Sequence, residues 1–241
     1  MLYLLIAEAA LETIPREVWS HPVIRKYAKK RGKSPSKLLL DLSFHYNAVK
    51  KLPHIEKRGR PDIVHIALLE ALGSPLNKVG KLKVYVHTFS DYIIEVNPET
   101  RLPRNYYRFV GLMEQLFELR KVPPRGKKIL LSLREGSIRD VVGEIAPTKT
   151  ILMNEKGEKV SLIELAEILT NTPKPLVIIG GFQRGNFTED TEKLADMKLS
   201  IFHEVLDTWV VVSRAITAYE IGIGLYTMKS HKDAQGVNKK A

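Results

Sequence analysis

The second half of the chain alternates short apolar runs with segments of helical period. Strands are expected at Lys128–Leu133, Thr150–Met153, Leu176–Ile179 and Leu199–Phe202. Helices are expected at Ser161–Leu169 and Asp207–Ile223. Strands that alternate with helices favour a mostly parallel sheet with helices on both faces. The predicted fold class is therefore α/β.

The first half of the chain predicts fewer strands. Leu2–Ala7 is nearly continuous in apolar residues, which indicates a strand buried on both faces. Pro61 begins a helix over Asp62–Leu72, because the missing N–H of proline has no partner in a first turn. Two more helices and one hairpin are expected, namely helices Val23–Arg31 and Tyr106–Leu119, and strands Lys83–Thr88 and Tyr92–Val96.

The composition excludes several classes of protein. The 241 residues are 44% hydrophobic, enough to bury a full core, and contain no cysteine. Disulfides, thiolate zinc sites, iron–sulfur clusters and cysteine nucleophiles are excluded. The seven histidines are scattered without metal-ligand spacing, so no metal is expected. Neither apolar stretch, Met1–Ala7 or Trp209–Leu225, could span a bilayer, so no membrane partner is expected.

The positive charge of the chain is concentrated in one region. The net charge is +11, and residues 21–60 carry 12 Lys and Arg against two acids, whereas residues 61–225 are balanced. A concentrated cationic segment favours a polyanion partner, because binding releases condensed counterions from a phosphate backbone. The alternative is a solvated face, and charge alone does not separate the two.

A glycine-containing turn follows the predicted strand Leu176–Ile179. Gly180 and Gly185 have the spacing of a phosphate-binding loop, but Asn186 and Phe187 stand where that motif requires Lys and Ser or Thr. Nucleoside triphosphate chemistry is therefore poorly supported. The glycines still allow a ligand to approach the backbone closely, as at the strand ends of other α/β folds. An ordinary glycine-rich turn is the alternative.

A second loop follows the next predicted strand. It comprises Ile201, Phe202, His203, Glu204, Val205 and Leu206. Loops from neighbouring strand ends can form opposite walls of one pocket. The alternative is that these apolar residues only pack on the sheet.

Two groups of arginines are candidates for nucleic-acid contacts. Arg60 precedes the helix whose first turn holds Asp62, close enough to orient the guanidinium. Asp62 also has a structural explanation, because an acid stabilises a helix N-terminus. Arg101, Arg104 and Arg108 interleave with tyrosines, a pattern that can bind unstacked RNA bases and their phosphates.

Five runs carry a resemblance to a known family. They are LDLSFHYNAVKKL at 40–52, KRGRPDIVHIALL at 57–69, LNKVGKLKVYVHT at 76–88, VNPETRLPRNYYRFVGLMEQL at 96–116 and VIIGGFQRGNF at 177–187. With these runs, residues 2–225 resemble the Emg/Nep family of ribosome-biogenesis pseudouridine methyltransferases, of the SPOUT superfamily. The short length resembles the archaeal members.

The resemblance implies a fold and an assembly. It implies a single SPOUT-type domain over 1–225, with a parallel sheet flanked by helices, a C-terminal trefoil knot and a family-specific inserted β-hairpin at about 79–98. It also implies a homodimer with the active site near the interface. Residues 226–241 are polar and are expected to form a flexible tail.

The resemblance further implies the site and the reaction. Gly180, Gly185 and the loop Ile201–Leu206 look like the site for the methyl donor, S-adenosylmethionine. Arg60, Arg101, Arg104 and Arg108 look like rRNA-binding arginines, and Asp62 looks like the residue that orients Arg60. Asp62 as a general base is doubtful, because pairing with Arg60 lowers its basicity.

The expected function is methylation of N1 of a pseudouridine in small-subunit rRNA during ribosome biogenesis. The expected setting is the cytoplasm, with a pre-ribosomal particle and ribosomal proteins as further partners. The alternative is an rRNA-binding assembly factor in which methyl transfer is secondary.

Overall fold

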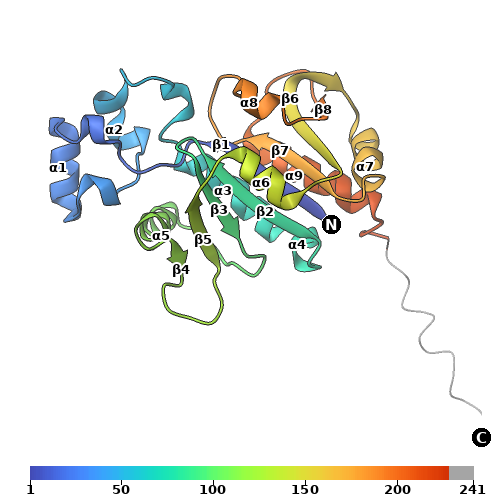
Figure 1. Cartoon of the computed structure of the whole chain (residues 1–241), viewed down its shortest axis with the longest axis horizontal. Coiled ribbons are helices and arrows are strands. Elements are labelled where there is room, and N and C mark those ends of the chain that lie inside the picture. Colours follow the sequence, from blue (N-terminus) through green and yellow to red (C-terminus); the bar gives the residue numbers. More distant parts are fainter. Residues whose placement is uncertain (228–241) are drawn as a thin grey trace, which may run out of the picture.

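One eight-stranded mixed sheet organises the chain. The structure is a computed structural model that describes residues 1–227, so 228–241, most of the tail predicted at 226–241, lie outside the described residues. The strands follow the order β4-β5-β3-β2-β1-β7-β6-β8 (Figure 1). Their bounds are β1 Leu2–Ala9, β2 Leu82–Thr88, β3 Tyr92–Val96, β4 Lys121–Val122, β5 Leu131–Glu135, β6 Lys149–Lys159, β7 Pro175–Gly180 and β8 Met197–Ser200.

The sheet is parallel on one side of β1 and mostly antiparallel on the other. β1 pairs in parallel with both β2 and β7, and β6 pairs in parallel with β7 and β8. Beyond β2 the sheet is antiparallel. The turn after β2 reverses the chain, so β3 pairs antiparallel with β2, and β5 pairs antiparallel with both β3 and β4. The α/β class is confirmed. The predicted hairpin is present, and its first strand is bonded to the central strand.

Helices cover both faces of the sheet. They are α3 Pro61–Gly73, α4 Pro75–Lys78, α5 Tyr106–Leu119, α6 Ile138–Ile145, α7 Leu162–Thr170, α8 Glu189–Glu192 and α9 Thr208–Gly222. Leu4 and Ile6 of β1 pack in the cluster that contains residues of α3, α5, α7 and α9. Leu5 and Ala7, on the opposite face, pack with residues of α6. Each face of β1 is therefore buried, as its continuous apolar run predicts.

Two expectations about local structure need correction. The strand predicted at Lys128–Leu133 lies at Leu131–Glu135, because Lys128 belongs to the connection that follows Pro123-Pro124. The helix α6 was not expected. It begins with a capping box in which Ser137 and Asp140 each bond the other's backbone N–H.

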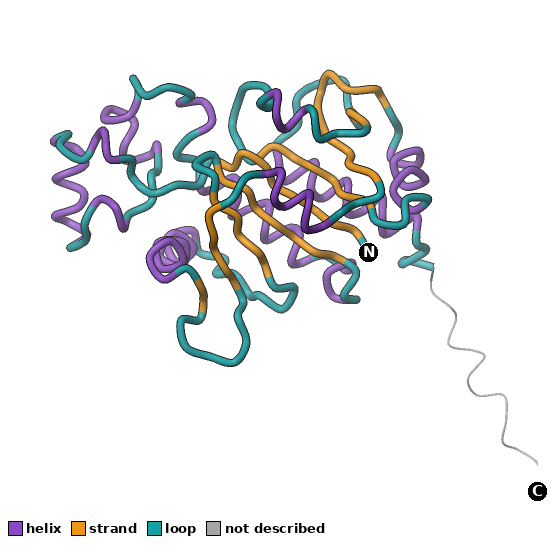
Figure 2. The backbone as a smooth tube through the Cα atoms, viewed as in Figure 1, coloured by secondary structure: helices purple, strands orange, loops and turns teal. Residues whose placement is uncertain are grey.

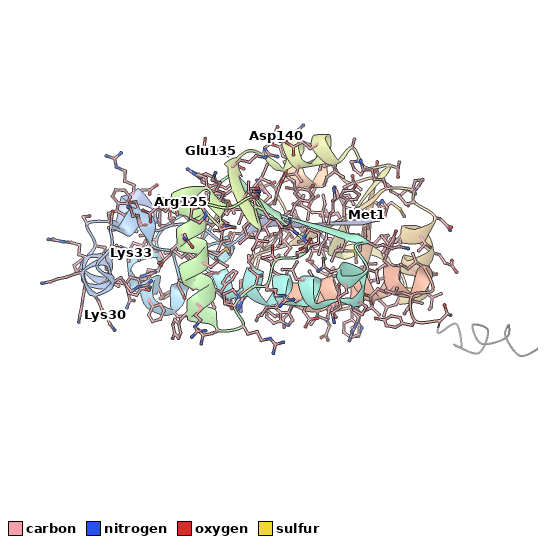
Figure 3. All side chains as sticks on the ribbon, turned by 90° about the horizontal axis from the view of Figure 1, so that it is seen from below. Met1, Lys30, Lys33, Arg125, Glu135 and Asp140 are labelled. Atoms are coloured by element: carbon pink, nitrogen blue, oxygen red, sulfur yellow. The ribbon has the colours of Figure 1, made fainter. Side chains whose placement is uncertain are left out.

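The basic segment forms a separate small layer beside the sheet. Helices α1 Pro22–Arg31 and α2 Leu42–Val49 lie together at one end of the molecule (Figure 2). They share an apolar cluster of their own. The buried carboxylate of Glu114 on α5 holds this segment, accepting from Arg31 at 2.9 Å and from Lys33 at 2.8 Å. Figure 3 shows Lys30 and Lys33 at the end of the molecule that carries α1.

The trefoil knot stays a prediction, because strand order and register describe which strands pair and not how the chain threads. The division into one domain over 1–225 with an insertion at about 79–98 also stays a prediction.

Candidate active site

A cavity of about 570 Å³ lies at the carboxyl ends of β7 and β8 and beside the middle of β6. This is the edge where open parallel sheets bind their ligands. The cavity combines apolar walls with a few polar groups, as small-molecule sites do. The residues that line the cavity include Arg60, Ile63, Asn154, Gly180, Phe182, Gly185, Phe187, Ile201, Phe202, Glu204, Val205, Leu206 and Thr208.

The glycine turn after β7 forms one wall of the cavity. A side chain at Gly180 would lie 3.0 Å from the ring of Phe182 and 3.3 Å from the ring of Phe187. Gly185 has a φ of +103°, a conformation that other residues rarely adopt. Thr208, at the start of α9, donates from Oγ1 to the carbonyl oxygen of Gly180 at 2.7 Å. The turn therefore needs its glycines and is fastened to the opposite wall.

The loop between β8 and α9 forms that opposite wall. Ile201, Phe202, Glu204, Val205 and Leu206 all line the cavity. His203 does not line it: its side chain is 73% exposed and its ring lies 4.1 Å from that of Phe202. The structure thus brings together every predicted donor-site residue except His203.

Arg60 stands at the margin of the cavity in a fixed orientation. Its Nε donates to Asp62 Oδ1 at 2.8 Å and its Nη2 donates to Oδ2 at 2.7 Å. Pro61 lies between Arg60 and Asp62 in the sequence and occupies the first turn of α3. The paired residues therefore flank a rigid helix start. The hydrogen bonds to Asp62 are the main cause that raises the pKa of Arg60, against the opposing effect of burial. The guanidinium is therefore a permanently charged, oriented group beside the cavity.

The other three arginines lie outside the cavity wall. Arg101, Arg104 and Arg108 are exposed, in the loop before α5 and in its first turn. Two contacts fasten this region near Arg60. His65 Nε2 of α3 lies 2.7 Å from the carbonyl oxygen of Pro103, and the Tyr106 hydroxyl donates to Asp41 at 2.6 Å. Tyr106 and Asp41 also raise the pKa of Arg60 electrostatically, so the arginine groups are neighbours.

Some residues of the site have no local signal in the sequence. Glu8 and Lys57 form a buried ion pair behind the glycine turn, and 48 residues separate them along the chain. Asn154 lines the cavity although it belongs to none of the five runs, and Phe182 lines it from within the run 177–187 but was not a predicted site residue. Glu8 alone gives a hint, because it interrupts an apolar strand with a charge.

Residues 1–227 contain no metal site and no membrane-spanning helix. Within that range no three His, Asp or Glu side chains are placed to hold a metal ion. No helix in the same part of the chain is long and apolar enough to cross a membrane.

The sheet and the cavity define an α/β protein with a cavity of small-molecule size between two loops at its parallel edge. Comparison with known protein families identifies the class of protein. The family model described as EMG1/NEP1 methyltransferase matches residues 4–220 of this chain. The chain therefore belongs to the EMG1/NEP1 methyltransferase family, and the resemblance seen in the sequence is confirmed.

Individual relatives match over nearly their whole length. The ribosomal RNA small subunit methyltransferase Nep1 of Staphylothermus marinus is 46% identical over 90% of this chain and 94% of that protein. Its counterpart in Pyrococcus furiosus is 45% identical over 91% and 96%. The crystal structure of Archaeoglobus fulgidus Nep1 bound to S-adenosylhomocysteine has a TM-score of 0.81 and 42% identity. It covers 92% of this chain and 98% of that one.

Proposed function

We propose that the cavity binds S-adenosylmethionine and that the protein methylates N1 of a pseudouridine in small-subunit rRNA. The residues present fit the donor: a cavity of about 570 Å³ joins a glycine turn with apolar side chains such as Leu206. The related Archaeoglobus protein, with S-adenosylhomocysteine bound, supports this assignment. When bound, the donor supplies an electrophilic methyl group on a sulfonium sulfur. The chain's main task is therefore to place the attacking nitrogen.

The observation that carries the proposal is the position of Arg60. It lines the donor cavity and is held by Asp62, while Arg104 and Arg108 lie exposed in the neighbouring region. An oriented guanidinium can clamp a phosphate or stack on a base that has left the helix. Both oxygens of Asp62 accept from Arg60, and this pairing lowers the basicity of the carboxylate, which favours an orienting role for Asp62 over that of a proton acceptor.

The chemistry of pseudouridine explains a preference over uridine. The sugar of pseudouridine is bonded through carbon, so N1 carries a proton, whereas N1 of uridine is bonded to the sugar. In the reaction N1 would form a bond to the methyl carbon, the carbon–sulfur bond would break with its electron pair left on sulfur, and the N1 proton would pass to water. Uridine offers no equivalent N1–H, so discrimination is chemical as well as steric.

The test uses labelled methyl donor and two versions of one small-subunit rRNA hairpin, with pseudouridine or with uridine at the target. Incorporation only into the pseudouridine hairpin is expected. Equal incorporation into both would show that the base is not recognised as proposed. Absence of incorporation into either, with donor binding shown by calorimetry, would contradict the proposed acceptor.

The proposal extends to assembly and place of action. Phe202 and Val205 are exposed apolar side chains at the cavity, and Val205 is 75% exposed. Exposed apolar side chains beside a cavity are typical of a surface that a partner covers, which supports a homodimer with the site at its interface. The reaction is placed in the cytoplasm on a pre-ribosomal particle, with ribosomal proteins as further partners.

One observation favours the second candidate, an rRNA-binding assembly factor. Arg25, Lys26, Lys29 and Lys30 of α1 are exposed, and no acidic side chain of residues 1–227 forms an ion pair with them. That surface binds phosphate without needing the donor. A variant that binds rRNA but no donor separates the two functions: full support of ribosome assembly by this variant would favour the factor.

A further inference from the structure

A buried carboxylate lies behind the donor-binding turn without touching the cavity. Glu8 is 4% exposed, at the carboxyl end of the central strand β1. Its φ is 51°, which is uncommon for a residue with a side chain, and the pairing of β1 with β2 shifts register there. A strained, buried and charged residue persists only where its surroundings hold it.

Four hydrogen bonds hold the Glu8 carboxylate. Lys57 Nζ donates to Oε2 at 2.5 Å. The other oxygen, Oε1, accepts from the Thr188 N–H at 2.8 Å, the Thr188 hydroxyl at 2.9 Å and the Thr191 hydroxyl at 2.7 Å. Burial acts to raise the pKa of Glu8, but these bonds together outweigh it, so the pKa is lowered. Glu8 is therefore ionised at neutral pH.

Two partners of Glu8, Thr188 and Lys57, lie next to residues that line the cavity. Thr188 directly follows Phe187, which lines the cavity. The Lys57 ammonium lies 4.5 Å from the centre of the Phe182 ring, which lines it too. Glu8 is thus connected to both ends of residues 182–188, the donor turn.

Lys57 also joins the donor turn to the segment that carries Arg60. A side chain at Gly185 would lie 3.5 Å from both Lys57 and Glu56, and the Arg184 N–H donates to the Glu56 carbonyl oxygen at 3.4 Å. The donor turn therefore packs against residues 56–57, three to four positions before Arg60.

We propose that Glu8 is a positioning residue that, through Thr188, Thr191 and Lys57, holds the donor turn in its binding-competent conformation. The inference rests on the proposed donor site. Without the carboxylate the turn would occupy several conformations, and the apparent donor affinity would fall by the fraction that remains competent. Saturating donor would restore the turn, so KM would change and kcat would not.

The chain offers a matched control in Glu12. Glu12 is also 4% exposed and also pairs with a cation of the same segment, Arg58, at 2.7 Å through both oxygens. It has no hydrogen bond to residues 182–191 among the described contacts. Glu8→Gln and Glu12→Gln both remove a buried carboxylate charge, but only the first acts on the donor turn.

The experiment measures S-adenosylhomocysteine affinity by calorimetry and amide exchange over 182–188. Glu8→Gln is expected to weaken binding at least about tenfold, the effect of one lost charge-assisted bond, and to speed exchange in the turn. Glu12→Gln is expected to keep affinity within about threefold at a comparable loss of stability. Equal losses in the two variants, or unchanged affinity in Glu8→Gln, would overturn the proposal.

A second variant covers the case in which Glu8→Gln does not fold. Thr191→Val keeps the shape of a side chain that is 1% exposed and removes one donor to Glu8. It is expected to raise the donor KM and leave kcat within about twofold. A fall in kcat without a change in KM would contradict a positioning role. If the wild-type protein bound no S-adenosylhomocysteine, the proposed donor site would fail, whereas the exchange comparison would still decide the role of Glu8.

Discussion

Arg60 and Asp62 form a two-point ion pair across the first turn of α3, with both donor–acceptor distances below 2.9 Å. Nη1 of the guanidinium takes no part in this pair, and Arg60 lines the cavity. The pair therefore fixes the direction of the arginine and leaves one face of it for a ligand.

Arg60→Ala is expected to weaken binding of the rRNA hairpin by about 10- to 100-fold and to leave S-adenosylhomocysteine affinity within about threefold. Asp62→Asn keeps the shape but loses the charge, so it is expected to lower kcat more than it lowers RNA affinity, because the arginine loses its orientation. Calorimetry with each ligand separates these effects. An equal fall in donor and RNA affinity in Arg60→Ala would contradict the assignment.

Arg104 and Arg108 are expected to act on phosphates. Replacing either with alanine should weaken hairpin binding and reduce the slope of log affinity against log salt by about one. Arg125, an exposed arginine in the connection between β4 and β5, is the matched control and should leave the slope unchanged (Figure 3). If replacing Arg125 with alanine reduced this slope as much, the effect would be one of net charge and not of specific phosphate contacts.

The parts of the fold that could be predicted are those with a strong local pattern. Tyr92–Val96 and Tyr106–Leu119 occur at the predicted bounds. The helix α6 did carry a signal, since Ile138, Val141 and Ile145 are buried at helical spacing behind a capping box. The helix has only eight residues, so its periodic pattern covers little more than two turns and is weak.

The parts of the candidate site that lie in continuous stretches of sequence could be predicted. The two loops meet at one cavity although β7 and β8 are not neighbours, because both pair in parallel with β6 and end at the same edge of the sheet. The Glu8–Lys57 pair could not be found in this way, since its partners come from separate segments and no local period connects them. Tertiary contacts between distant charges are a property of the folded chain alone.

His45 is expected to make the stability depend on pH. Its side chain is buried, and its Nδ1 accepts from the Asp41 N–H at 3.0 Å. Burial lowers its pKa from 6.5 to about 4, with Arg31 acting in the same direction and Asp41 against it. The unfolded chain therefore binds this proton more readily than the folded one. Stability is full above pH 6.5 and falls toward pH 4, with a slope of up to about 1.4 kcal/mol per pH unit.

Urea unfolding between pH 7.5 and pH 4.5 measures this slope. His45→Asn keeps an acceptor for the Asp41 N–H and removes the titrating ring, so the variant should be less stable at pH 7.5 but less sensitive to acid. Glu8 contributes in a lower window, because its depressed pKa means that its stabilisation is lost only below 4.5. An unchanged slope in His45→Asn over this range would assign the acid sensitivity to another group.

Gly181, which directly precedes the donor turn, is expected to tolerate a side chain least among Gly180, Gly181 and Gly185. A Cβ there would lie 2.7 Å from the Ile6 side chain and 2.8 Å from the Ala9 backbone. The Gly181 N–H donates to the Ala7 carbonyl oxygen at 2.8 Å, and the Ala10 N–H donates to the Gly181 carbonyl oxygen at 2.8 Å. The turn is thus tied to the end of β1 and cannot move aside without breaking these bonds.

Gly181→Ala should therefore cost about 1–3 kcal/mol of unfolding free energy and displace the wall that contains Gly180 and Phe182, with weaker donor binding. Gly111→Ala, in α5, is the opposite case, because nothing lies within 4 Å of its Cβ and its backbone is helical. It should gain about 0.4–1 kcal/mol and leave donor affinity unchanged. Chemical unfolding and calorimetry measure both. Equal stability changes in the two variants would show that the contact with β1 does not hold the donor turn.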